Sequence, residues 1–374
     1  MRYAPFLNEQ GRIGFVAPSF GCNIEPYHTA FQNALKQFER KGYQAVLGPN
    51  CYAGEGIGIS NTPEKCAQEL MEYYCTDDNE VLISCGGGEL MCEVLAFLDF
   101  DRLSQASPKW YMGYSDNTNM TFLQATLCDT AAIYGPCAAA FGMEPWHPAI
   151  HDALAVLKGE KLTVSDYGKW EKEGLKDELN PLAPYHVTEP SVLRLYKPGV
   201  TEPEMIPCSG KAARNCISGE EEAAHEDKSV PSVRTTFSGR LIGGCMDCLV
   251  TLLGTEFDKV AAFQERYRED GFIWFLEACD LNVMAIRRAV WQMEHAGWFR
   301  YVKGFLIGRP LCHGEELMGL DQYHAVVDLL AGHKVPIVMD ADIGHIPPMM
   351  PIICGSMGDV TVYEDGMTLA MRCE

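Results

Sequence analysis

Short apolar stretches alternate with amphipathic stretches over the first 130 residues, and this alternation constrains the fold more than any other feature of the chain. The apolar stretches have the length of buried strands, and the intervening stretches carry apolar residues at helical spacing. The predicted strands are residues 12–19, 44–48, 80–84 and 110–114, and the predicted helices are residues 26–41, 62–74 and 89–98. Strands that alternate with helices form right-handed crossovers and a parallel sheet. We therefore predict an α/β fold whose N-terminal domain, residues 1–165, is a doubly wound parallel sheet of flavodoxin or Rossmann type.

A second α/β pattern follows residue 235 and predicts a smaller C-terminal domain over residues 236–374. Its predicted strands are residues 271–277, 302–308 and 335–339, its predicted helices are residues 283–296 and 318–332, and a closing hairpin is expected over 361–371. Residues 166–235 differ, because they contain several prolines and a polar stretch at 219–228. We interpret them as a bridging segment with extended pieces.

Composition excludes some classes of partner. The formal net charge is -21, which argues against nucleic acid or an anionic membrane surface as a partner. No apolar run approaches the ~20 residues that cross a bilayer, and the first ten residues lack the apolar core of a signal peptide. The 16 cysteines are scattered, so we expect free thiols in a reducing cytoplasm. Cys245 and Cys248 have no second pair at zinc spacing, which favours core thiols and predicts neither metal nor cofactor.

Ser115 lies at the break between a predicted strand and a predicted helix. The strand ends at Gly113, and residues 116–119 are of the types that cap helix N-termini. A hydroxyl on such a turn projects above the sheet edge, and the following backbone N–H groups point toward whatever it attacks. The alternative is a serine that only caps the helix, and the pattern alone does not distinguish the two.

Two other residues supply what a nucleophilic serine needs. Glu277 follows five apolar residues at the end of a predicted strand, and His345 lies on a Gly/Pro-rich loop just after another. An imidazole can take the serine proton, and a carboxylate can hold the imidazole in the required tautomer. The backbone N–H groups of Asp116 and of Gly88, in the glycine triplet 86–88, are the expected oxyanion donors. Taken singly, Glu277 also fits a solvated strand end, and His345 an ordinary loop histidine.

The order of these motifs resembles the LD-carboxypeptidase family of serine peptidases, which includes murein tetrapeptide carboxypeptidases and microcin C self-immunity proteins. The matching motifs are Ala17-Pro-Ser19, Gly87-Gly88, Gly113-Tyr-Ser-Asp-Asn-Thr118, Tyr134-Gly-Pro136, Gly243-Gly244, Leu276-Glu277 and Ile343-Gly-His345. The resemblance implies that Ser115 is the nucleophile, His345 the base and Glu277 its orienting partner. It also implies a small peptide-like substrate, a site between two domains, and a homodimer.

The chain departs from the murein-type members at the glycine triplet. Those members usually carry arginine where this chain has Gly86, and the nearby Glu89 would repel a substrate carboxylate. Gly87 and Trp170 are further expected substrate contacts, Trp170 by stacking on a planar group such as a nucleobase, with ordinary packing as its alternative. These signs favour a microcin-immunity-like activity on aminoacyl or peptidyl nucleotides. The murein activity stays open, since Arg309 or another basic residue could bind the carboxylate instead.

Two further classes remain possible from the residues alone. One is a non-catalytic protein that binds a peptide or nucleotide in the cleft of the doubly wound sheet. It is distinguished by geometry, because a hydrolase requires His345 within hydrogen-bonding reach of both Ser115 and Glu277. The other is a cysteine hydrolase that uses Cys85 or Cys312 with His313, for which no orienting partner is evident.

Overall fold

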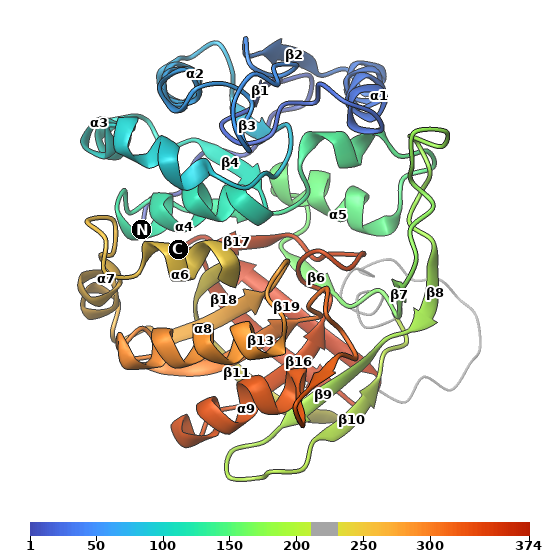
Figure 1. The fold of residues 1–374 in the computed structure, drawn as a ribbon, viewed down its shortest axis with the longest axis vertical. Coiled ribbons are helices and arrows are strands. Elements are labelled where there is room, and N and C mark those ends of the chain that lie inside the picture. The colour runs from blue at the N-terminus through green and yellow to red at the C-terminus, as the bar shows by residue number, and fades with distance from the viewer. Residues whose placement is uncertain (211–230) are drawn as a thin grey trace.

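The chain folds around two β-sheets that lie one above the other in Figure 1. The structure, a computed structural model, describes residues 1–210 and 231–374. The predicted α/β fold is confirmed, with parallel strands at the centre of both sheets. The polar stretch 219–228 lies outside the described residues. The described part of the chain contains no helix that is long and apolar enough to cross a membrane.

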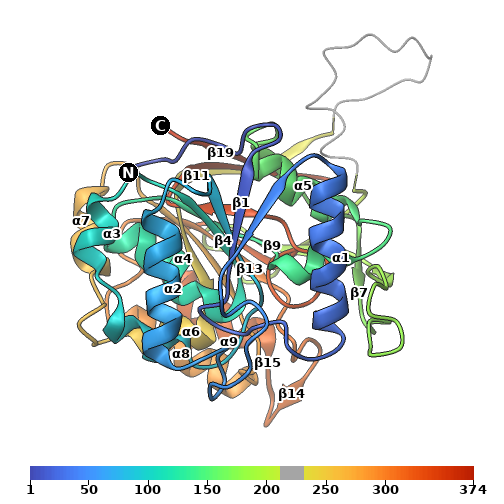
Figure 2. The same cartoon turned by 90° about the horizontal axis from the view of Figure 1, so that it is seen from above.

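The first sheet has six strands in the order β17-β5-β4-β3-β1-β2. Its strands are β1 (Arg12–Val16), β2 (Gln44–Leu47), β3 (Val81–Ser84), β4 (Trp110–Gly113), β5 (Ala132–Tyr134) and β17 (Ile352–Cys354). The first five are parallel, and the order reverses between β1 and β3, where doubly wound sheets bind their ligands. Helices α1 (Tyr27–Arg40) and α2 (Pro63–Cys75) lie on opposite sides of β1 in Figure 2.

The second sheet has nine strands in the order β10-β9-β16-β13-β12-β11-β18-β19-β6. Its parallel centre is β11 (Val233–Cys245), β12 (Phe272–Glu277), β13 (Val302–Gly308) and β16 (Ile337–Ala341). The flanking antiparallel strands are β6 (Thr163–Ser165), β9 (Val192–Tyr196), β10 (Glu204–Pro207), β18 (Met357–Tyr363) and β19 (Gly366–Arg372). Its helices include α6 (Met246–Leu252), α7 (Val260–Arg266), α8 (Val283–His295) and α9 (Gln322–Leu330).

Strand exchange ties the two sheets together. Strand β17, from the last part of the chain, pairs with β5 of the first sheet, and β6 pairs with β19 of the second. Helix α4 (Thr118–Thr126) lies between the two sheets in Figure 1, and all nine of its residues are buried. A helix that is buried on every side holds its neighbours at a fixed separation. The carboxyl ends of β4, β12 and β16 are thereby kept within one region.

Two segments differ from their predicted form. Residues 89–98 form a 3₁₀ helix, η1 (Met91–Phe97), followed by the short helix α3 (Phe100–Gln105), rather than one α-helix. Residues 166–210 contribute β9 and β10 to the second sheet, and a separate two-stranded hairpin of β7 (Lys169–Glu171) and β8 (Val187–Pro190). The boundaries at residues 165 and 235 stay a prediction.

Candidate active site

Ser115 occupies a strained turn at the carboxyl end of β4. Its φ is 63°, in the left-handed region that side chains rarely adopt, and it begins the short 3₁₀ helix η2 (Ser115–Asn117) that leads into α4. Gly113, just before the turn, has no room for a side chain, because a Cβ there would lie 2.8 Å from Asn117. Backbone strain of this kind persists where the surroundings fix it, and it lifts the hydroxyl clear of the sheet.

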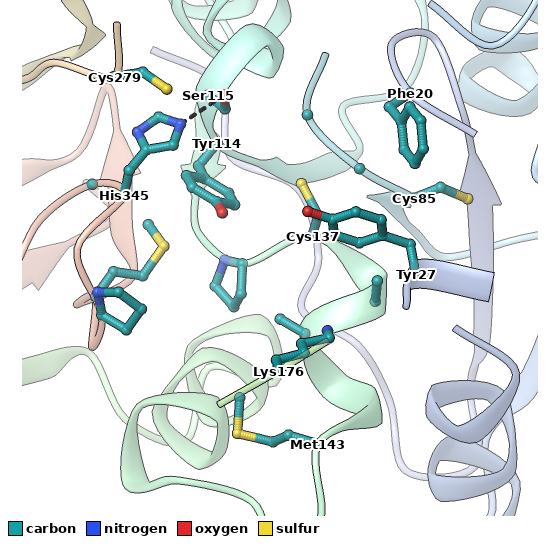
Figure 3. A pocket seen from close by; sticks show the side chains of 18 of the residues that line it. Phe20, Tyr27, Cys85, Tyr114, Ser115, Cys137, Met143, Lys176, Cys279 and His345 are labelled. Atoms are coloured by element: carbon teal, nitrogen blue, oxygen red, sulfur yellow. Dashed lines mark hydrogen bonds between the residues drawn. The ribbon is translucent and has the colours of Figure 1, made fainter. Parts of the chain in front are cut away.

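His345 and Glu277 reach Ser115 from the second sheet. The Nε2 atom of His345 lies 2.8 Å from the Ser115 Oγ, and its Nδ1 lies 2.8 Å from a Glu277 carboxylate oxygen (Figure 3 shows the first contact). Glu277 ends β12 and is fully buried, whereas His345 stands on the loop after β16. The geometric requirement for a hydrolase is therefore met, and the three side chains form one continuous hydrogen-bonded chain.

The electrostatics of the pair favour an ionised carboxylate beside the imidazole. Burial alone would raise the pKa of Glu277, but the charge of His345 and hydrogen bonds from His345 and Tyr134 hold that pKa below its usual value. Burial alone would likewise lower the pKa of His345, but the Glu277 carboxylate raises it well above the usual value. Each group stabilises the charged form of the other, so an imidazolium formed during reaction is stabilised where it forms.

Tyr134, at the end of β5, is a member of the site whose role the sequence did not indicate. Its hydroxyl donates to the Glu277 carboxylate oxygen that His345 does not use, and accepts from the Ser115 backbone N–H at 3.3 Å. Tyr134 thus joins the nucleophile's backbone to the carboxylate across the two sheets. The sequence signal that points to this role is a tyrosine hydroxyl at the end of an otherwise apolar buried strand.

The glycine triplet approaches Ser115 through its backbone. A Cβ on Gly87 would lie 2.9 Å from the Ser115 Cβ and 3.0 Å from its Oγ, so only glycine fits without moving the serine. Gly88 packs on Ser19, where a Cβ would lie 2.3 Å from the hydroxyl oxygen. The triplet therefore forms a backbone edge beside the nucleophile.

The side chain of Asp116, next to the nucleophile, joins the loop after β1, the start of η1 and helix α4. Its carboxylate accepts from the Ser19 hydroxyl at 2.5 Å, the Met91 backbone N–H at 2.9 Å and the Asn119 amide at 3.0 Å. Burial raises the pKa of Asp116, although these hydrogen bonds oppose the rise. The backbone of Asp116 is consequently held in place, as a donor to an oxyanion must be.

Ser115 and His345 open onto a pocket of about 480 Å³, within the range of small-molecule sites. The side chains around it are mostly apolar or aromatic, and Figure 3 shows Lys176 and Met143 at the end away from Ser115. The lining includes Phe20, Tyr27, Cys85, Gly86, Gly87, Gly88, Glu89, Tyr114, Cys137, Met143, Glu171, Lys176, Tyr185 and Cys279. Gly87, the predicted substrate contact, and Gly88, the predicted oxyanion donor, both belong to this lining, and their roles stay a prediction.

Trp170 and Arg309, by contrast, are not brought into this pocket. Glu171 lines the pocket, whereas its neighbour on β7, Trp170, does not and packs on His313 with ring centroids 5.1 Å apart. Arg309 is 2% exposed, and its guanidinium binds the Asp340 carbonyl oxygen and the Asp342 carboxylate. These contacts disfavour a substrate-binding role for either residue in this conformation, and that role stays a prediction.

The cysteine alternatives are also disfavoured by the structure. Cys85 lines the pocket, but burial raises the pKa of its thiol well above the usual value, which suppresses the nucleophilic thiolate. His313 packs against Trp170 and does not belong to the pocket lining. Cys245, Glu277 and His345 offer ligand atoms within 4.8 Å of one another, but both His345 ring nitrogens already have hydrogen-bond partners. We therefore interpret this cluster as a hydrogen-bonded site rather than a metal centre.

Comparison with known families gives two matches along the chain. The model described as LD-carboxypeptidase N-terminal domain matches residues 13–135, and the model described as LD-carboxypeptidase C-terminal domain matches residues 238–360. The microcin C7 self-immunity protein MccF of Escherichia coli is 24% identical over 92% of this chain and 88% of that protein. A probable murein peptide carboxypeptidase of Bacillus subtilis (strain 168) is 22% identical over 97% of this chain and 93% of that protein.

Solved structures share the whole fold. MccF in complex with aspartyl sulfamoyl adenosine superposes with a TM-score of 0.75 at 19% identity, covering 100% of this chain and 99% of that one. An MccF-like protein from Bacillus anthracis str. Ames superposes with a TM-score of 0.74 at 18% identity, covering 100% of both chains. At these identities the superpositions establish the two-sheet architecture.

Proposed function

The chain belongs to the LD-carboxypeptidase family of serine peptidases, and from that premise we propose that it cleaves an amide bond with Ser115, His345 and Glu277 as its catalytic triad. The observation that carries the proposal is the pair of 2.8 Å contacts that joins the three side chains beside the pocket. A non-catalytic binding protein would have no need of a strained serine in contact with a carboxylate-paired imidazole.

The first half of the reaction forms an acyl-enzyme. The Ser115 Oγ attacks the amide carbon while its proton passes to the Nε2 of His345, and Glu277 stabilises the imidazolium. The negative oxygen of the tetrahedral intermediate is bound by the backbone N–H groups of Gly88 and Asp116. When the carbon–nitrogen bond breaks, the imidazolium gives its proton to the leaving nitrogen, and the acyl group stays on Ser115 as an ester.

The second half releases the acyl group. Water enters in place of the leaving amine, gives a proton to His345 and attacks the ester carbon. Collapse of this second intermediate returns the proton from His345 to the Ser115 Oγ and frees a carboxylic acid. The reaction consumes one water, and the triad is left in its starting protonation state.

For the substrate, we propose an aminoacyl- or peptidyl-nucleotide conjugate. Gly86 stands where murein-type members carry arginine, and Glu89 on the same loop disfavours an anion there. The rings of Phe20, Tyr27 and Tyr185 line the pocket and provide faces on which a planar group can stack. Relatives named for microcin C7 self-immunity, one solved with an aminoacyl sulfamoyl nucleoside, support the same choice.

The murein tetrapeptide is the second candidate. Lys176 lines the pocket and supplies a cation that could bind a free carboxylate, as release of a terminal D-amino acid requires. We also propose that the protein is a cytoplasmic homodimer. The free thiols of the described cysteines support the cytoplasmic location, and the resemblance to the family, whose members are commonly dimers, supports the homodimer.

The test compares hydrolysis of a murein tetrapeptide with hydrolysis of an aminoacyl phosphoramidate nucleotide by the parent protein and by Ser115→Ala. We expect kcat/KM to favour the nucleotide, and the variant to lose about 10⁴–10⁶ in rate, as triad members typically do. Ser104→Ala is the matched control, because its hydroxyl donates to the Asp101 carbonyl on α3, away from the pocket.

Two outcomes would change the assignment. Turnover by Ser115→Ala at the parent rate, with an unchanged melting temperature, would reject Ser115 as the nucleophile. Release of D-alanine from the tetrapeptide without cleavage of the nucleotide would select the murein activity instead.

A further inference from the structure

Among the residues that the structure describes, Lys176 is the one lysine in the pocket lining, which contains no arginine. It comes from the loop between β7 and β8, and Figure 3 shows it pointing into the cavity from the end away from Ser115 and His345. Its ammonium lies 5.6 Å from the centre of the Tyr27 ring, which holds the side chain against the pocket wall. The charge is thus presented to whatever fills the cavity.

No carboxylate of the described residues lies within ion-pairing distance of this ammonium. The two acidic side chains on the same lining are Glu89, which is exposed, and Glu171, whose carboxylate accepts the backbone N–H of His186 at 2.5 Å. Burial lowers the pKa of Lys176, as expected for a cation partly removed from water without a counterion. A ligand anion would recover the lost solvation, whereas a neutral ligand would not.

One lysine on a lining that also carries two glutamates favours a singly charged ligand group. A dianionic phosphate binds best where several donors converge, which this lining does not provide. A carboxylate needs only one cation and a few hydrogen-bond donors, which a lining with a single lysine can provide.

We propose that Lys176 is a specificity-determining residue that binds a carboxylate of the substrate at the end of the pocket away from Ser115. This inference rests on the proposed function, because it assigns the part of the substrate that Ser115 does not attack. The carboxylate has two possible sources, an acidic aminoacyl side chain on a nucleotide conjugate or the free end of a peptide.

The test measures binding in the Ser115→Ala background, so that it does not depend on turnover. Two matched ligand pairs are titrated by calorimetry: aspartyl against asparaginyl sulfamoyl adenosine, and a murein tetrapeptide against its C-terminal carboxamide. Members of each pair differ by one negative charge. We expect the acid of at least one pair to bind about tenfold to a hundredfold more tightly than its amide, the usual range for a hydrogen bond to a charged group. The pair that discriminates identifies the source of the carboxylate.

Substitution of Lys176 then shows whether this residue causes the preference for the acid over the amide. Lys176→Met should bring the acid-to-amide affinity ratio to about one, and Lys176→Arg should restore most of it. Lys172→Met is the control, because Lys172 is an exposed lysine of the same loop that lies outside the pocket lining. The acid-to-amide affinity ratio of this variant should match that of the parent. Melting temperatures of all variants verify folding.

Three results would overturn the proposal: equal affinity for acid and amide in both pairs, a preserved ratio in Lys176→Met, or the same collapse in Lys172→Met. Failure of the proposed hydrolysis is distinguishable, because the parent would then show acid-selective binding without turnover. Turnover without acid-selective binding would reject the role of Lys176 alone.

Discussion

Two walls of the pocket are held in different ways. The strand-end wall, formed by Gly87, Ser115, Cys279 and His345, belongs to loops and turns at the carboxyl ends of β3, β4, β12 and β16. The loop wall is formed by Glu171, Lys176 and Tyr185. They lie at the end of β7 and on the loop between the short strands β7 and β8, at the edge of the molecule in Figure 1. The first wall is anchored by two sheets, and the second by a hairpin.

Few hydrogen bonds fasten the loop wall to the body. Glu171 donates its backbone N–H to the Pro347 carbonyl, and Glu144 donates its backbone N–H to the Leu182 carbonyl, both at 2.8 Å. A loop that few hydrogen bonds hold to the body can accept substitutions without disturbing the two sheets. The comparison indicates that the proposed triad and the proposed carboxylate-binding Lys176 lie on parts of the molecule that can vary separately.

The largest expected effect comes from Glu277→Gln, because Glu277 holds His345 of the strand-end wall. A glutamine amide facing His345 would favour the tautomer that carries a proton on Nε2, which cannot accept the Ser115 proton. We expect kcat to fall about 10⁴-fold, the scale seen for the equivalent change in another serine protease. The Tyr134 hydroxyl can still bond the side-chain oxygen, so the fold should survive.

Single-turnover kinetics and thermal melting check this expectation together. A loss of activity matched by loss of the folded protein would mean that Glu277 acts mainly as a structural group. Activity within tenfold of the parent would remove Glu277 from the triad.

The parts of this wall that the sequence predicted are those with local signals. Ser115 follows a strand and precedes capping residues, Glu277 ends an apolar run, and His345 follows a strand on a glycine-containing loop. Each signal lies within a few residues of the side chain it concerns. Tyr134 was missed because its role appears only when β5 and β12 meet across the two sheets.

The loop wall was predicted poorly for physical reasons. Trp170 is an obvious aromatic in the sequence, but a strand of three residues does not reveal which face is turned to the pocket. Arg309 was a plausible cation, yet the buried Asp342 carboxylate takes its charge. Lys176 had no sequence signal that set it apart from its neighbouring lysines.

The next largest effect is expected for Gly87→Ala. The new methyl group would lie about 3 Å from the Ser115 side chain, so the serine or the glycine loop must shift. We expect kcat/KM to fall about 10²–10³-fold, comparable to loss of one oxyanion donor.

Gly332→Ala is the matched control, because its Cβ would meet no atom within 4 Å, and it should keep the parent rate. Full activity of Gly87→Ala would show that the glycine triplet is not in contact with the reacting serine.

The pH dependence gives a smaller, graded effect. His345 must be neutral to accept the Ser115 proton, and its pKa is raised by Glu277. The imidazole therefore stays protonated to a higher pH than an ordinary histidine, whose pKa is about 6.5. We expect the acidic limb of the pH profile, in which kcat/KM falls about tenfold per pH unit, to begin above pH 6.5. In Glu277→Gln the residual activity should show this limb at lower pH, since the charge that raises the pKa is gone. A limb at the same pH in both proteins would assign it to another group.

The smallest effect separates the pocket-facing and outward-facing aromatics of the hairpin. Tyr185 lines the pocket, so Tyr185→Ala should raise KM about threefold to tenfold, the worth of one aromatic contact. Trp170 contacts His313 and Arg309 outside the pocket, so Trp170→Ala should change kcat and KM by less than about twofold. It should lower the melting temperature, since it removes partly buried packing. Steady-state kinetics and thermal melting on the two variants test the assignment of faces directly. If Trp170→Ala raised KM more than Tyr185→Ala did, the outward face of β7 would have to turn toward the substrate during binding, and the loop wall would be a moving part rather than a fixed one.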